Sequence, residues 1–223
     1  MNRWTVRLAW IIPMVSVLAS MMVHHLKGAA IAPLIFISQA DMPGPEAIIF
    51  TLGLSISGAW QAWTVWVMTA DEPNPWSPER CVGLLASISV IAMANRSMYS
   101  HLDAHILAAL GIFVFGWAWL GLVQRRSRRM GANRGVSQRQ FTLWCVGLGF
   151  MAQNIGVAVA LQVDPNVALP TANAGHPWWS VAALGEYLLV GGLWWGIATI
   201  ERDPELMDGT VKTDSNTSDG HRA

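Results

Sequence analysis

The sequence predicts an all-α, polytopic membrane protein, a bundle of six transmembrane helices with both termini in the cytosol. Three observations lead to this fold class. The 223-residue chain is 53% hydrophobic and only 13% charged, whereas soluble domains carry about 25% charged residues. Six apolar runs are long enough to cross a bilayer, and the basic residues gather on one side of them. The net charge is zero, which gives no indication of nucleic-acid binding.

Each apolar run is expected to be a helix, because lipid offers no partner to a bare backbone N–H or C=O group. A span needs about 20 mostly apolar residues. Within a transmembrane domain of residues 1–200, the predicted spans are about 4–23, 47–70, 81–99, 102–123, 141–161 and 178–200. The first run could be a cleaved signal peptide, but it is long for one, and we expect it to be retained. Residues 201–223 are polar and aperiodic, and are expected to form a disordered cytosolic tail.

The basic residues predict the orientation of these spans. With a cytosolic N-terminus, 12 of the 14 Lys and Arg residues lie in the inner segments, and only Lys27 and Arg96 lie outside. The opposite orientation would carry the arginine-rich loop between residues 123 and 141 across the membrane, which is disfavoured. This loop could also contact anionic lipid headgroups; the residues expected to do so are Arg125, Arg126, Arg128 and Arg129. The preference of basic residues for the cytosolic side would by itself also explain the arginines of this loop.

Glu186 is the most informative residue for function. It lies about eight positions into the last predicted span, or roughly 12 Å below the outer end of that span. A charge at this depth costs several kcal/mol unless it is protonated, paired or hydrated. Glu186 is therefore expected to face the bundle interior. One possibility is a functional role, in which Glu186 binds a proton or a lipid headgroup. The other is a structural role, in which its protonated carboxyl forms a hydrogen bond to a neighbouring helix.

Two histidines, His101 and His105, lie four residues apart and therefore on one face of a helix. Such a pair can bind Zn²⁺ when a third ligand is present, but no HExxH motif accompanies it. We expect no metal and no other cofactor. The two histidines are expected near the membrane surface, with His105 packed inward against the last span.

The first outer loop carries two acids, Asp41 and Glu46, separated by a segment with two prolines and a glycine that prevent a continuous helix. Asp41 could cap a turn, and Glu46 could stabilise the start of the second span through the helix dipole. Alternatively, both acids belong to a polar mouth at the outer face, together with His105 and Glu186.

The same residues carry a resemblance to a known family, in an order and spacing that cover nearly the whole chain. The matching positions are Ser38, Asp41, Pro45-Glu46, Phe50, Asn95, His105 and Glu186-Tyr187. In these the chain resembles the DRAM family of damage-regulated autophagy modulators. That family is related to Sfk-type proteins, to factors that remodel the lipid of GPI anchors, and to the N-terminal part of Cwh-type proteins. The chain departs from the family pattern where Arg96-Ser97 replaces Phe-Gln and where Tyr187 replaces Trp.

The resemblance implies six helices with cytosolic termini, a place in an endomembrane (Golgi or lysosome) or the plasma membrane, and a lipid-linked role. The leading hypothesis is therefore a protein that binds or remodels a lipid or GPI-type glycolipid in its outer half. Its membrane-lipid partner would contact Ser38, Asp41, Glu46, Asn95 and His101. If the protein is an enzyme, His105 would be the base, within hydrogen-bonding distance of Glu186, which orients or protonates it.

The main alternative is a non-enzymatic scaffold or regulator of trafficking, autophagy or lipid asymmetry. A proton-coupled transporter is disfavoured, because the inner halves of the spans carry almost no ionisable residues. A lipid-sized groove that reaches His105 and Glu186 would favour lipid handling, and a filled bundle would favour the scaffold.

Overall fold

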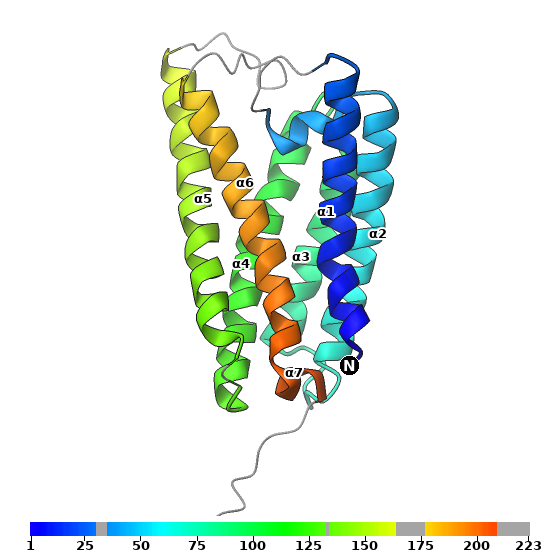
Figure 1. The fold of residues 1–223 in the computed structure, drawn as a ribbon, viewed down its shortest axis with the longest axis vertical. Coiled ribbons are helices and arrows are strands. Elements are labelled where there is room, and N and C mark those ends of the chain that lie inside the picture. Colours follow the sequence, from blue (N-terminus) through cyan, green and yellow to red (C-terminus); the bar gives the residue numbers. More distant parts are fainter. Residues whose placement is uncertain (30–34, 133, 164–176, 209–223) are drawn as a thin grey trace, which may run out of the picture.

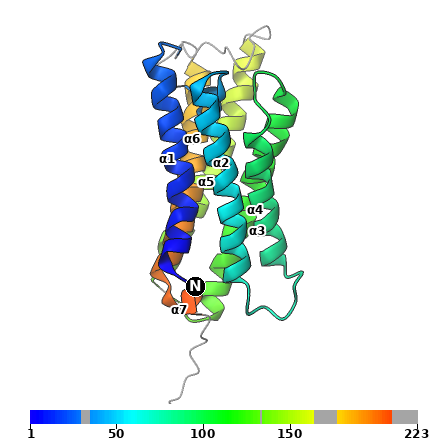
Figure 2. The same ribbon diagram turned by 90° about the vertical axis from the view of Figure 1, so that its right-hand side faces the viewer.

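The computed structural model describes residues 1–29, 35–132, 134–163 and 177–208, and within these ranges all regular structure is helical. Six long helices run side by side as a bundle (Figures 1 and 2): α1 (Arg3–Leu26), α2 (Pro45–Met68), α3 (Pro78–Ala94), α4 (Leu102–Arg129), α5 (Val136–Val163) and α6 (Pro177–Ala198). Shorter helical segments are η1 (Ile37–Asp41), η3 (Thr199–Arg202) and α7 (Pro204–Asp208).

Five of the long helices, α1, α2, α4, α5 and α6, are long and apolar enough to cross a membrane. Their outward surfaces carry large apolar side chains, such as Leu26, Leu107 and Trp144, which are 80%, 72% and 66% exposed. A continuous apolar surface of this kind is unfavourable in water and suits hydrocarbon. The chain is therefore an all-helical integral membrane protein. The remaining long helix, α3, has 17 residues and packs against α2 and α4.

The arginine-rich segment is more helical than the sequence predicts. Helix α4 continues to Arg129 and α5 begins at Val136, so the connection between them is short. Polar side chains at the ends of both helices find partners at the base of the bundle, which allows the helices to extend beyond their apolar runs.

The prediction of a disordered tail from residue 201 is wrong for residues 201–208. They form the end of η3 and helix α7, where Leu206 and Met207 are buried. The N-terminal amine of Met1 donates a hydrogen bond to the carbonyl oxygen of Met207. A single apolar pair in a polar segment gives no helical period, which is why the sequence pattern did not reveal this packing. Residues 209–223 lie outside the described residues.

A buried ion pair fastens this C-terminal segment to the bundle. Nη2 of Arg139 lies 2.8 Å from Oδ2 of Asp203, and both side chains are fully buried. Arg139 also donates to the hydroxyls of Ser127 (2.6 Å) and Thr199 (3.1 Å), and Asp203 accepts from the backbone N–H of Gly135 (2.8 Å). Removing one partner of such a pair leaves an uncompensated buried charge, at a cost of about 3–5 kcal/mol.

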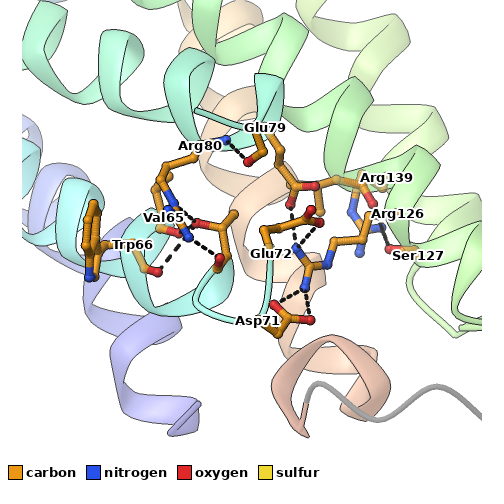
Figure 3. A network of polar contacts seen from close by, with 12 residues as sticks. Val65, Trp66, Asp71, Glu72, Glu79, Arg80, Arg126, Ser127 and Arg139 are labelled. Atoms are coloured by element: carbon orange, nitrogen blue, oxygen red, sulfur yellow. Dashed lines mark hydrogen bonds and ion pairs between the residues drawn. The ribbon is translucent and has the colours of Figure 1, made fainter. Parts of the chain in front are cut away.

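Arg126 anchors the connection between α2 and α3 to α4 (Figure 3). Its guanidinium donates to Asp71 at 2.6 and 2.8 Å and to Glu72 at 3.1 Å, and Glu79 lies 3.7 Å away. Arg126 is only 6% exposed, so its charge is already neutralised inside the protein. The predicted contact with lipid headgroups is therefore wrong for Arg126, whereas Arg125, Arg128 and Arg129 are exposed.

Helices α5 and α6 are in close contact because glycines face each other across the pair. A Cβ atom added to Gly185 would lie 2.4 Å from the backbone nitrogen of Gln153, and one added to Gly149 would lie 2.6 Å from that of Leu189. Gly156 and Gly192 meet the opposite helix in the same way. Small residues allow membrane helices to approach at backbone distance. The α5–α6 pair therefore forms a tight unit beside α1–α4.

We predict that Gly185→Ala destabilises the protein by about 1–3 kcal/mol, because its methyl group must push the α5 backbone away. The matched control is Gly191→Ala on the same helix, where an added Cβ meets nothing within 4 Å. Thermal unfolding in detergent micelles measures both variants. Equal melting temperatures for the two variants would contradict this account of the α5–α6 contact.

Candidate functional site

The bundle contains an internal cavity of about 270 Å³, lined by residues of η1 and of all six long helices. Most of the lining side chains are apolar, among them Val17, Phe50 and Leu193. A smaller set is polar: Ser38, Gln61, Thr64, Ser87, His105, Gln153, Asn154 and Glu186. A mostly apolar cavity with a few polar groups is typical of a small-molecule site.

The cavity opens sideways between α4 and α5. Ile106 and Leu110 of α4 and Asn154 of α5 line the cavity and are also exposed on the outside of the bundle. The end of the bundle that holds Arg126 and Arg139 is called the arginine-bearing end. Nearer this end, the same two helices are joined by a hydrogen bond from the indole N–H of Trp117 to the carbonyl of Leu143 (3.1 Å). The opening therefore lies in the half of the bundle away from the arginines, between two helices that are long and apolar enough to cross a membrane.

Glu186 lies inside the bundle and is 6% exposed. Its carboxylate accepts a hydrogen bond from the backbone N–H of Ile37 at 2.6 Å and further hydrogen bonds from the backbone and hydroxyl of Ser38. These donors form the N-terminus of η1, so the carboxylate satisfies groups that a helix start leaves without partners. Of the two roles expected for Glu186, the structure contains the structural hydrogen bond, directed to η1.

Neighbouring residues of α6 hold the same segment in place. The hydroxyl of Tyr187 donates to the carbonyl oxygen of Ile35 (2.9 Å), and the ring of Trp179 packs edge-on against Phe36 with centroids 6.1 Å apart. As a result η1 lies between α1 and α6 within one end of the bundle (Figure 1). Ile37 and Ser38 thereby become part of the cavity wall.

His105 lines the same cavity but does not bond to Glu186. Its Nδ1 lies 2.6 Å from the carbonyl oxygen of Arg96, which can only accept, so Nδ1 carries the proton. Its Nε2 is buried without a hydrogen-bond partner among the described residues. The predicted hydrogen bond between His105 and Glu186 is therefore wrong, because the carboxylate is already engaged by the backbone of η1.

His101 is exposed at the start of α4 and makes no side-chain cap there. It is absent from the cavity wall, so the two histidines do not converge on one site. In the described part of the chain, no group of three or more His, Cys, Asp or Glu side chains is placed to hold a metal ion.

Asp41 is buried on the other side of η1, where it connects this segment to the turn between α3 and α4. Its carboxylate accepts from the backbone N–H of Met98 at 3.3 Å, and the side chain is 1% exposed. Burial raises the pKa of Asp41 to about 6. The hydroxyl of Tyr99 donates to the carbonyl of Gln39 (3.1 Å), which makes the same connection. Asp41 thus caps a turn, and it does not line the cavity.

Glu46 and Asn95 also lie away from the cavity. Glu46 is fully buried and accepts from the ammonium group of Lys27 at 2.8 and 2.9 Å, with Nδ1 of His24 at 3.8 Å. The exposed amide of Asn95 donates to the hydroxyl of Ser55 (2.9 Å). The four residues of the predicted polar mouth therefore do not form one site. His105 and Glu186 line the cavity together with Ser38, whereas Asp41 and Glu46 hold the segment around η1 in place.

Two polar residues of the cavity wall, Gln153 and Asn154, were not predicted as site residues. They lie on α5 beside Gly185 and hence near the level of Glu186, since a Cβ on Gly185 would touch Gln153. The signal in the sequence is a consecutive amide pair in the middle of an otherwise apolar run. Polar residues within a membrane span usually face the bundle interior.

The fold and site together define an integral membrane protein with an internal cavity whose wall is mostly apolar and carries a few polar groups. No family model, no curated protein and no solved structure matches this chain. The function therefore has to be argued from the cavity itself.

We predict that the stability of the protein falls as pH rises from about 4 to about 6, in a way that depends on Asp41. Folding raises the pKa of this carboxyl from 3.8 to about 6, so it favours the neutral form. Asp41 therefore contributes about 3 kcal/mol to the free energy of unfolding below about pH 4, and this contribution is lost as pH rises to the raised pKa of the carboxyl group in the folded protein. Asp41→Asn cannot ionise and should gain stability relative to the wild type between pH 4 and pH 8, measured as melting temperature. Asp103→Asn, which changes an exposed aspartate of α4, is the matched control, and parallel pH profiles for wild type and Asp41→Asn would refute the assignment.

Proposed function

We propose that this protein binds a membrane lipid in its internal cavity and that the lipid enters sideways between α4 and α5. One observation carries the proposal: a mostly apolar cavity with a few polar groups has exposed wall residues on α4 and α5, two helices that are long and apolar enough to cross a membrane. An acyl or isoprenoid chain suits the apolar part of the wall. The polar part of the lipid would lie near Ser38, His105 and the amides of α5.

The polar groups, rather than the apolar wall, would select the ligand. Lipid tails are as apolar as the cavity wall, so moving a tail from the bilayer into the cavity yields little hydrophobic free energy. A hydrogen bond made inside the cavity has no competing water. His105 is suited to this role, because its unpartnered Nε2 can accept from a hydroxyl or an ammonium group. The amides of Gln153 and Asn154 add both donors and acceptors.

The geometry favours binding over chemistry. A general base needs an orienting partner and access to the proton that it removes. The acid expected to assist His105 is engaged by η1, and the proton on Nδ1 is donated to a backbone carbonyl. This arrangement supports the non-enzymatic alternative, in which a bound lipid regulates or stabilises a membrane scaffold. Remodelling of a GPI-type glycolipid, which the resemblance to the DRAM family implies, stays a prediction.

We further propose that α3 is the sixth span and that both chain ends face the cytosol. In support, Met1 bonds to Met207 of α7 at the arginine-bearing end of the bundle, so the start of α1 and the segment after α6 lie at the same end. Exposed arginines on one side of a membrane indicate the cytosolic side. Residence in an endomembrane or in the plasma membrane follows from the same resemblance and is equally a proposal.

The lipid site is tested by narrowing its opening. Ile106→Trp places a large ring at the mouth of the cavity and should reduce the lipid that co-purifies with the protein by at least about tenfold. Native mass spectrometry of the protein released from detergent measures the bound lipid directly. The matched control is Leu107→Trp, on the adjacent position of α4, which is 72% exposed and does not line the cavity. Undiminished lipid in Ile106→Trp, with melting temperatures equal to wild type, would overturn the proposal.

The orientation is tested with single cysteines in a background where Cys81 and Cys145 are replaced by serine. His25→Cys lies on an exposed position at the end of α1, and Arg128→Cys lies on an exposed position at the opposite end of the bundle. In bacterial spheroplasts, a membrane-impermeant maleimide should label His25→Cys at once and Arg128→Cys only after lysis. The reverse pattern would place the arginines outside and end the topology proposal.

A further inference from the structure

A second pocket lies at the arginine-bearing end, between the start of α1 and the end of α6. Its volume is about 630 Å³, and it is separate from the cavity inside the bundle, with which it shares no lining residue. Its charged and aromatic lining residues are Arg3, Arg7, Arg134, Arg202, Glu201, Trp10 and Trp195. Three parts of the chain that are distant in sequence thus bring four guanidinium groups to one concave surface.

Within the described part of the chain, most of this positive charge is not neutralised. Glu201 accepts from Nε of Arg7 at 2.8 Å and from the indole N–H of Trp10 at 3.4 Å, so the one carboxylate of the pocket is engaged. Arg3, Arg134 and Arg202 are exposed, and none of the described acids forms an ion pair with them. The pocket therefore has an excess of three positive charges.

The buried arginines at this end differ from those of the pocket. Arg126 and Arg139 are buried and their charges are compensated by acids. Arg80 is also buried, with its guanidinium bonded to the hydroxyl of Thr69 (2.9 Å) and stacked over the ring of Trp66 (4.8 Å). Structural arginines in this protein are thus enclosed and satisfied, whereas those of the second pocket remain available to an external anion.

Exposed aromatic side chains flank the pocket. Trp195 is 53% exposed and packs edge-on against Phe141, which is 58% exposed, with centroids 6.3 Å apart. At the start of α1, Trp4 is 59% exposed and lies under the guanidinium of Arg7. Tryptophans of membrane proteins concentrate at the interface between hydrocarbon and water. The guanidinium groups therefore lie at the depth of lipid headgroups.

We propose that this pocket binds a phosphate ester, with Arg3, Arg134 and Arg202 as its principal contacts. Guanidinium groups pair with phosphate through two parallel hydrogen bonds, a geometry that ammonium groups do not reproduce. Basic pockets between membrane helices bind anionic headgroups on the cytosolic side. The same chemistry would accept a dissolved phosphate ester, so the source of the phosphate is part of the test. This proposal is independent of the lipid in the internal cavity.

The test compares two triple variants of the full-length protein in detergent. Arg3→Gln/Arg134→Gln/Arg202→Gln removes the free charges of the pocket, and Arg125→Gln/Arg128→Gln/Arg129→Gln removes three exposed arginines of α4 that do not line it. Binding of phosphatidylglycerol, with phosphatidylcholine as the zwitterionic reference, is titrated by native mass spectrometry. The pocket variant should bind phosphatidylglycerol at least about tenfold more weakly than wild type, and the α4 variant within about twofold of it.

Two further measurements sharpen the outcome. Arg3→Lys/Arg134→Lys/Arg202→Lys keeps the charge and should bind at an affinity between those of wild type and the glutamine variant, which separates guanidinium recognition from charge alone. Competition by dissolved glycerol 3-phosphate would assign the site to free phosphate esters, and its failure to compete would assign the site to a membrane lipid. Wild-type binding by the pocket glutamine variant, or equal losses in both glutamine variants, would overturn the proposal.

Discussion

The hydrogen bonds from the start of η1 to the carboxylate of Glu186 are the interaction on which the end of the bundle away from the arginines depends. Within a bilayer, an irregular backbone segment is tolerated only where its polar groups find partners inside the protein. Glu186 supplies that partner for Ile37 and Ser38. Once η1 is held inside the bundle, the hydroxyl of Ser20 bonds to the carbonyl of Ala40 (2.7 Å) and Asp41 reaches the α3–α4 turn. The carboxylate of Glu186, together with these contacts, thus keeps η1 inside the bundle, where Ile37 and Ser38 line the cavity.

The two ends of the bundle handle charge in different ways. At the end that contains η1, the buried acids bind backbone N–H groups or a single lysine, which leaves little free charge near the cavity. At the opposite end, buried arginines hold the connections between helices, as Arg126 and Arg139 do (Figure 3). In the second pocket, Arg3, Arg134 and Arg202 have no ion pair with an acid among the described residues, as is also true of the exposed arginines of α4. The distribution separates structural charge from charge that is available to a ligand, a distinction that a count of arginines cannot make.

The sequence predicted the helices well, because long apolar runs and the cost of bare backbone groups in lipid leave few alternatives. It also indicated that Glu186 faces inward, since a carboxylate in hydrocarbon is costly. It could not identify the partner of Glu186, because that partner is a backbone N–H 149 positions away and backbone groups leave no mark in the side-chain pattern. For a similar reason, the sequence pattern predicts that Arg139 lies in a polar loop. Its partner Asp203 lies in a segment that has too few apolar residues to predict any packing.

The cavity follows from unequal packing of the helices. Glycines draw α5 and α6 into backbone contact, and such a close pair has little freedom to adjust its outer surfaces to α4. Where α4 carries Trp117 the gap to α5 is bridged, but toward the other end the facing residues Ile106, Leu110 and Asn154 leave it open. An opening into hydrocarbon would admit any lipid tail at little energetic cost, so access alone gives no selectivity. Discrimination must come from polar groups whose positions are fixed before the ligand arrives. His105 and Ser38 meet this condition, because the carbonyl of Arg96 orients the imidazole and Glu186 holds the backbone of the serine.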